Sequence, residues 1–240
     1  MSFDSQCLAM PHISAATLHS QQIIRTTALS AVLAIALGVF MQAAIISVKL
    51  LGGANIPGVA MAAGLVQSVT WSTVICVGVS IATSVSKGRK ALAGLLGACF
   101  APLGVATAKA MHKGTLELLS AVDQPAVLPL LMVGTVRALE YGLLAWILTS
   151  FAERDMRRPL PYLATGLSIG IVGGSVQTFL ACQTHLANGV PLAMPQIAGT
   201  LVSEVGSPLG CAFVILVSQI LPQHTKAYAV SRPVGGAAPN

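Results

Sequence analysis

Residues 26–51, TTALSAVLAIALGVFMQAAIISVKLL, form a long apolar run that indicates the fold class. It contains one charged residue, Lys49, and it is longer than the ~20 residues that a helix needs to cross a bilayer. A signal peptide has an apolar segment of only about 7–15 residues, so we predict a retained transmembrane helix here. Five more apolar runs follow, at residues 58–84, 91–111, 127–151, 161–185 and 196–221.

The composition of the whole chain agrees with six such helices. Charged residues make up 8% of the 240 positions and hydrophobic residues 55%, and the mean hydropathy is +0.81. A typical soluble domain has roughly 25% charged residues, so this chain has too few charges to cover a water-exposed surface. The high hydrophobicity also excludes a disordered chain. We therefore predict an all-α integral membrane protein with six transmembrane helices in a lipid bilayer.

The basic residues predict how the helices are oriented. Basic side chains gather in the loops at 87–90 and 153–158, whereas the loops at 52–57 and 186–195 contain no Lys or Arg. Because basic loops stay on the cytoplasmic side, both termini are predicted to be cytoplasmic, in a bacterial inner membrane. This orientation accounts for the net charge of +6, so nucleic acid is not expected as a partner. Residues 1–25 are predicted as a tail, 112–126 as an outer connection and 222–240 as a disordered tail.

The two halves of the chain share a sequence pattern. The letters AG at 93–94 are followed by APLGVA at 101–106, and AG at 198–199 by SPLGCA at 207–212. Small residues also recur at every fourth position of the second and fifth runs, and they include Gly64, Ser68, Ser72 and Cys76 in one and Gly166, Gly170 and Gly174 in the other. We predict two inverted three-helix repeats, residues 26–111 and 127–221, with these stripes as close-packing faces, either within the chain or between subunits.

Polar side chains of several runs fall at one predicted depth near the middle of the membrane. At 1.5 Å per residue they lie roughly 12–15 Å below the outer surface. Polar groups are costly inside a bilayer, so this alignment predicts a functional site. Prolines lack an N–H, and two of them are predicted to break their helices at or near this depth. The polar set is Gln42, Gln67, Arg137, Gln177 and Glu204, and the prolines are Pro102 and Pro208.

The spacing of the charged residues leaves two interpretations open. Arg137 and Glu140 are three residues apart, hence on one helix face, and Arg137 shares its depth with Glu204. In the structural interpretation, these charges only fasten helices together. In the functional one, Arg137 binds an anion, Glu204 takes up a proton or cation, and Ser203 and Ser207 add hydroxyl groups. A cavity that reaches Arg137 and Glu204 would favour function, and a dry, packed pair would favour structure.

Lys49 and Lys109 stand near the predicted outer ends of their helices. Long basic side chains at such positions commonly extend along apolar surface to the lipid headgroups. We therefore predict that both lysines reach the membrane surface and take no part in the site.

No pattern of residues predicts catalysis. The sequence GLSIG at 166–170 matches GxSxG, but it lies in an apolar run rather than between a strand and a helix. The histidines show no metal-binding spacing, and no nucleotide-binding loop is present, so neither a metal site nor a cofactor is expected. We predict a small inner-membrane transporter or channel for an ion or small organic solute, working as a homo-oligomer. The alternative is a non-catalytic subunit or assembly factor of a larger membrane complex.

Overall fold

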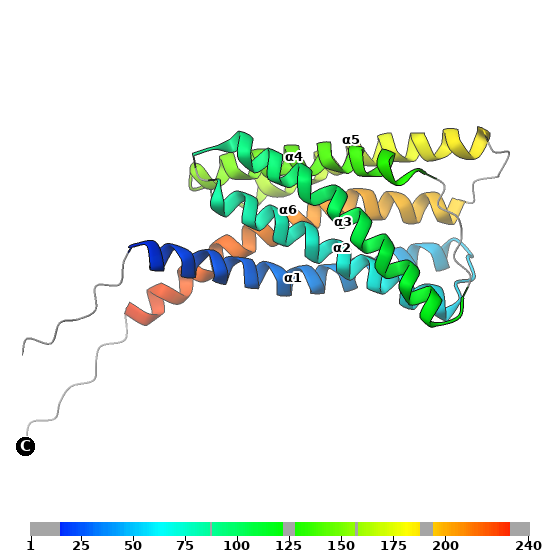
Figure 1. Ribbon diagram of the computed structural model, residues 1–240, viewed down its shortest axis with the longest axis horizontal. Coiled ribbons are helices and arrows are strands. Elements are labelled where there is room, and N and C mark those ends of the chain that lie inside the picture. Colours follow the sequence, from blue (N-terminus) through cyan, green and yellow to red (C-terminus); the bar gives the residue numbers. More distant parts are fainter. Residues whose placement is uncertain (1–14, 87, 122–127, 157, 188–193, 231–240) are drawn as a thin grey trace, which may run out of the picture.

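A computed structural model describes residues 15–86, 88–121, 128–156, 158–187 and 194–230. These residues form six helices that lie along a common direction in an elongated bundle, with the start of the first and the end of the last at the same end (Figure 1). The helices are α1 (Ala15–Leu51), α2 (Gly58–Val85), α3 (Lys90–Leu118), α4 (Leu130–Glu153), α5 (Pro159–Ala187) and α6 (Met194–Val230). Each apolar run of the sequence therefore lies in a helix of its own.

All six helices are long and apolar enough to cross a membrane, with candidate spans of 24 to 29 residues. Large apolar side chains also cover the outside of the bundle. More than half of the surface of each of Phe40, Leu95, Leu139 and Val172 is exposed. A water-soluble protein seldom exposes so many large apolar side chains, whereas lipid covers them readily. The fold is that of a multi-pass membrane protein.

Proline and glycine mark several of the helix ends. Pro57 and Pro129 directly precede α2 and α4, where a missing N–H removes no helical hydrogen bond. Pro159 is the first residue of α5 for the same reason. Gly53 and Gly88, in the loops after α1 and α2, have φ of +78° and +80°. Glycine adopts this left-handed conformation without the steric clash of a Cβ atom, so it lets the chain turn back.

α1, α3 and α6 extend well beyond the predicted runs, whereas the other three helices pass their predicted ends by one or two residues. α1 begins at Ala15, inside the predicted tail, because residues 15–25 contain neither Gly nor Pro to stop it. α6 passes Pro222 and ends at Val230, so the first part of the tail predicted to be disordered is helical. α3 continues to Leu118, into the predicted outer connection. Residues 1–14, 122–127 and 231–240 lie outside the described part of the chain.

The predicted helix breaks at Pro102 and Pro208 are wrong. Both prolines lie inside continuous helices, α3 and α6. An interior proline removes the hydrogen bond to the carbonyl four residues earlier, and packing against neighbouring helices can hold the helix together across that gap. For Pro208 that carbonyl belongs to Glu204, so a helical hydrogen bond is missing at the predicted site.

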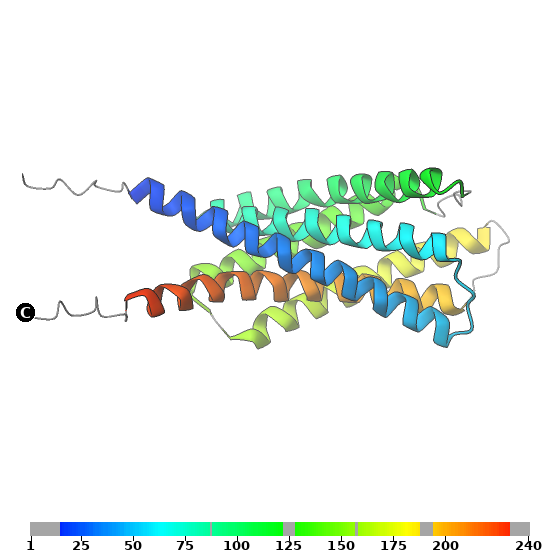
Figure 2. The ribbon, with the colours of Figure 1, turned by 90° about the horizontal axis from the view of Figure 1, so that it is seen from below.

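Helices α2, α4 and α6 form the interior of the bundle. Each of them contacts the other two, and each outer helix packs between two of them: α1 against α2 and α6, α3 against α2 and α4, and α5 against α4 and α6. Figure 2 shows α1 running obliquely between α2 and α6. Side chains that the three inner helices point toward one another therefore meet on the axis of the bundle.

Both predicted stripes are close-packing faces, and both are used within the chain. A Cβ atom on Gly170 would lie 2.8 Å from the carbonyl oxygen of Val205, so α5 approaches the backbone of α6. A Cβ atom on Gly64 would lie 2.5 Å from Nε2 of Gln42, so α2 presents its stripe to α1. Ser68, on the same stripe, donates a hydrogen bond of 2.9 Å to Oε1 of Gln42. The stripes therefore give no support to a contact between subunits.

The close contact between α3 and α4 was not predicted. A Cβ atom on Gly97 would lie 2.5 Å from the carbonyl oxygen of Tyr141, and one on Gly142 would lie 3.0 Å from that of Gly94. The signal in the sequence is the pair Gly94 and Gly97, which are three residues apart rather than four. A spacing of three also keeps two residues on one helix face.

The half of the bundle nearer the chain termini has an apolar core. Ile75 of α2, Leu144 of α4 and Ile215 of α6 are at most 1% exposed and belong to one cluster of buried side chains. At the rim of this half, the Tyr162 hydroxyl donates a 3.1 Å hydrogen bond to Gln219, joining α5 to α6. The inner helices are therefore closed to one another at this end.

Candidate functional site

A cluster of three charged side chains lies between the inner helices. Nη1 of Arg137 is 3.0 Å from Oε2 of Glu140, and Nη2 is 2.5 Å from Oε1 of Glu204. All three side chains are at most 8% exposed. Both pairings considered from the sequence therefore occur together, and one guanidinium joins a carboxylate of α4 to a carboxylate of α6.

The third inner helix covers the face of this guanidinium. Cζ of Arg137 lies 5.2 Å from the ring centroid of Trp71 in α2. Trp71 in turn meets Tyr141 edge to face, with ring centroids 5.6 Å apart. A desolvated cation–π contact contributes about 2 kcal/mol, so Arg137 ties all three inner helices together. Trp71 was not predicted as a site residue. The one signal in the sequence is that this tryptophan lies in mid-span, whereas tryptophan is usually enriched at the membrane interface.

Two carboxylates share one guanidinium, so with all three groups ionised the cluster carries one net negative charge. Among the described residues, Oε1 of Glu140 and Oε2 of Glu204 are buried and have no hydrogen-bond partner. A buried carboxylate oxygen without a partner is unfavourable, which favours uptake of a proton or a cation. Both terminal nitrogens of Arg137 are already engaged. The geometry therefore favours Glu204 as a proton or cation site over Arg137 as an anion site.

Helix α5 leaves room for the cluster. A Cβ atom on Gly173 would overlap Oε1 of Glu140, so only a glycine lets this carboxylate lie against the helix. One turn further along the same face is Gln177, which is 6% exposed and whose Nε2 has no partner among the described residues. Gln177 was predicted as a site residue and Gly173 was not, because Gly173 lies beside the stripe of small residues at every fourth position.

A cavity of about 680 Å³ leads from the cluster to one end of the bundle. Its deep walls include Trp71, Arg137 and Glu204, and its outer walls include Pro57 and Ala121, in the connections that follow α1 and α3. These connections lie at the end away from the chain termini (Figure 1). Toward the other end, apolar side chains fill the space between the inner helices, so this cavity is open on one side.

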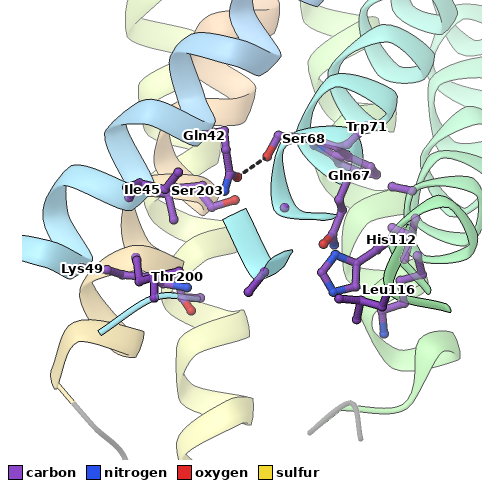
Figure 3. A pocket seen from close by; sticks show the side chains of 18 of the residues that line it. Gln42, Ile45, Lys49, Gln67, Ser68, Trp71, His112, Leu116, Thr200 and Ser203 are labelled. Atoms are coloured by element: carbon purple, nitrogen blue, oxygen red, sulfur yellow. Dashed lines mark hydrogen bonds between the residues drawn. The ribbon is translucent and has the colours of Figure 1, made fainter. Parts of the chain in front are cut away.

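Six of the eight predicted binding residues line this cavity, namely Gln42, Gln67, Arg137, Gln177, Ser203 and Glu204. The other two do not. Glu140 reaches the site through its ion pair with Arg137, and Ser207 is buried close to one turn deeper in α6. Figure 3 shows Gln42 and Ser203 on one wall and Gln67 and Trp71 on the other, with the hydrogen bond from Ser68 to Gln42 between them.

No family model, curated protein or solved structure matches this chain. Among the residues that the structure describes, no group of three or more His, Cys, Asp or Glu side chains could hold a metal ion.

The two lysines predicted to reach the membrane surface line the cavity instead. A Cβ atom on Gly199 would lie 2.7 Å from Cε of Lys49, so this lysine is laid against α6. Lys109 and His112 line the cavity from α3, and Figure 3 shows His112 opposite Lys49. Neither lysine forms an ion pair with a carboxylate in the described ranges. Whether these lysines face the cavity or the lipid depends on how α1 and α3 are rotated about their axes, and that rotation cannot be read from the sequence.

Proposed function

We propose that this protein is an inner-membrane transporter that moves a small polar solute through the cavity above Arg137 and Glu204. The observation that carries the proposal is that the cavity reaches the charged cluster. An ion pair that only fastened α4 to α6 would be packed dry, without a polar-lined cavity beside it. A volume of about 680 Å³ also falls within the ~300–1,000 Å³ of small-molecule sites.

A transporter fits the interior better than an open channel. Beyond the cluster, Ile75, Leu144 and Ile215 fill the space between the inner helices. A solute that enters the cavity can leave on the other side only if α2, α4 and α6 separate there. Alternate opening of the two sides around one central site is how secondary transporters work. The unbalanced charge of the cluster would let proton or cation binding accompany each cycle.

Blocking the cavity should abolish transport. Thr200 lines the cavity, whereas the next residue, Leu201, is 40% exposed and does not line it. In proteoliposomes, we expect at least one of a panel of labelled amino acids, organic acids, amines and sugars to enter faster than in empty liposomes. Thr200→Trp should reduce that uptake at least tenfold and Leu201→Trp should leave it within twofold. Uptake of none of these solutes, or equal uptake by the two variants, would contradict the proposal.

We also propose that the cavity opens to the outside of the cell and that both termini are cytoplasmic. The exposed residues Arg89 and Arg154 lie at the end of the bundle that holds the termini, and loops rich in arginine stay inside. In a background with the native cysteines replaced, a membrane-impermeant maleimide added to intact cells should label Asn55→Cys and not Arg89→Cys. The reverse labelling would refute the orientation.

The other functional alternative is a non-catalytic membrane subunit or assembly factor. This alternative predicts a different result in the transport experiment. No solute would enter the proteoliposomes, and a partner protein would co-purify with the chain. The proposal includes no catalytic activity. A homo-oligomer and an ancestral duplication stay predictions from the sequence. Since α2 lies inside the bundle and α5 at its periphery, two repeats would have diverged in how their middle helices pack.

A further inference from the structure

We propose that the solute is a small zwitterion, whose ammonium group binds at Glu204 and whose carboxylate lies near Lys49 and Lys109. This inference rests on the proposed transport function and names the class of substrate. It is carried by the separation of charge along the cavity, with an unsatisfied carboxylate at the deep end and lysines toward the mouth.

The deep end of the cavity can bind a positively charged hydrogen-bond donor. Oε2 of Glu204 is buried without a hydrogen-bond partner in the described part of the chain, and the residue is only 6% exposed. The cluster holds two carboxylates and one guanidinium. An ammonium group placed at Glu204 would balance the charges, two against two, and would supply the missing donor. Such a charge-assisted hydrogen bond is roughly twice as strong as one between neutral groups.

The outer part of the cavity carries the opposite charge. Lys49 on α1 and Lys109 on α3 line it from different helices, and neither is paired with a carboxylate of the described residues. Amide and hydroxyl groups of Gln42, Gln67 and Ser203 line the space between the two ends. They can hold the polar backbone or linker of a solute without adding charge.

This arrangement disfavours solutes with a single charge. A simple cation would have to pass and then remain near Lys49 and Lys109, whose charges repel it. A simple anion would meet, at the deep end, a cluster that already carries excess negative charge. A solute with both charges is attracted at both ends, and complementary charges of this kind select against the wrong partner by repulsion.

The distance between the two ends indicates how far apart the charges of the solute are. The Lys49 stem lies against Gly199, and Glu204 follows five residues later in α6. At 1.5 Å per residue this separates them by roughly 7–8 Å along the helix. A charged hydrogen bond spans about 2.8 Å at each end, so the solute itself has to cover only the remaining few ångström between its ammonium and its carboxylate. The charges of an α-amino acid such as glycine and those of a short, flexible ω-amino acid can both reach the two ends.

The test measures binding to the purified full-length protein in detergent by calorimetry. The probes are 4-aminobutyrate and its two singly charged halves, butylamine and butyrate. We expect 4-aminobutyrate to bind at least tenfold more tightly than either half. Lys49→Gln should weaken the binding of 4-aminobutyrate at least tenfold and should not weaken that of butylamine, because it removes a charge that repels cations. Equal affinity for 4-aminobutyrate and either half would overturn the inference.

A matched control separates the cavity from general charge effects. Lys113 lies at the same end of the bundle on α3, is exposed, forms a surface ion pair with Glu117 at 3.8 Å and does not line the cavity. Lys113→Gln should leave 4-aminobutyrate binding unchanged, and a loss equal to that of Lys49→Gln would overturn the inference. If only uncharged or singly charged solutes are transported and Thr200→Trp blocks their uptake, the inference of a zwitterion is wrong and the transport function stands. If no solute is bound or transported, both are wrong.

Discussion

Arg137→Met should nearly abolish the yield of folded protein, whereas Glu204→Gln and Glu140→Gln should each fold well. The asymmetry follows from the charges of the cluster. Removing the guanidinium leaves two buried carboxylates facing each other without a counter-ion. Breaking a buried ion pair by removing one partner costs about 3–5 kcal/mol, and here two pairs break at once. Removing either carboxylate has a smaller effect, because Arg137 stays paired with the remaining carboxylate and the pair has no net charge.

The combined variants separate structure from function. The double change of Arg137→Met with Glu204→Gln should rescue only part of the yield, because Glu140 stays buried and unpaired. Adding Glu140→Gln removes the last charge, and this triple variant should fold nearly as well as the parent. It should transport nothing, because the proton or cation site is gone. Yield and melting temperature of the detergent-purified variants, together with proteoliposome uptake, measure the two effects.

Several outcomes would contradict this account of the cluster. Arg154 is an exposed arginine at the end of α4, so Arg154→Met provides a matched control that should behave as the parent. If Arg137→Met is as stable as Arg154→Met, the ion pairs do not hold the helices together. If the triple variant transports as fast as the parent, the cluster fastens the helices and has no role in transport.

The second large effect is expected at the contact between α5 and α6. Gly170→Leu should lower the stability by about 1–3 kcal/mol or more, the usual effect of overpacking a filled interior. The atoms in the way are backbone, the carbonyl oxygen and Cα of Val205 at 2.8 and 2.9 Å from a Cβ on Gly170. Backbone atoms cannot rotate aside, so the two helices have to separate and lose van der Waals contact that lipid does not replace. The melting temperature and the yield should both fall.

Two controls show whether the contact, rather than the glycine itself, is responsible. Gly114 is an exposed glycine of α3, and a Cβ atom on it would meet no described atom within 4 Å, so Gly114→Leu should be tolerated or slightly stabilising. Ile171 follows Gly170 and is 50% exposed, so Ile171→Leu should be neutral. Ser72→Leu, on the buried stripe of α2, should behave like Gly170→Leu. Equal melting temperatures for all four variants would remove the argument from close packing.

The sequence predicted part of the site because some of its geometry is local. The spacing of three residues is enough to place Arg137 and Glu140 on one helix face. The rise per residue is enough to bring Arg137 and Glu204 to one depth once the helix ends are known. Neither rule states which helices are neighbours. The sequence therefore left open that both carboxylates bind the same guanidinium and that Trp71 covers its face.

The six helices, their length and apolar character, and the faces on which small residues allow close approach could be predicted from the sequence. These properties depend on the hydropathy and side-chain size of residues close together in the chain, which are the same in any arrangement of the helices. The tertiary structure alone decided that α2, α4 and α6 form the interior, that Gly173 makes room for Glu140, and that Lys49 turns into a cavity instead of toward the lipid. These features depend on how each helix is rotated and which helices it meets, and that follows from the packing of all six together.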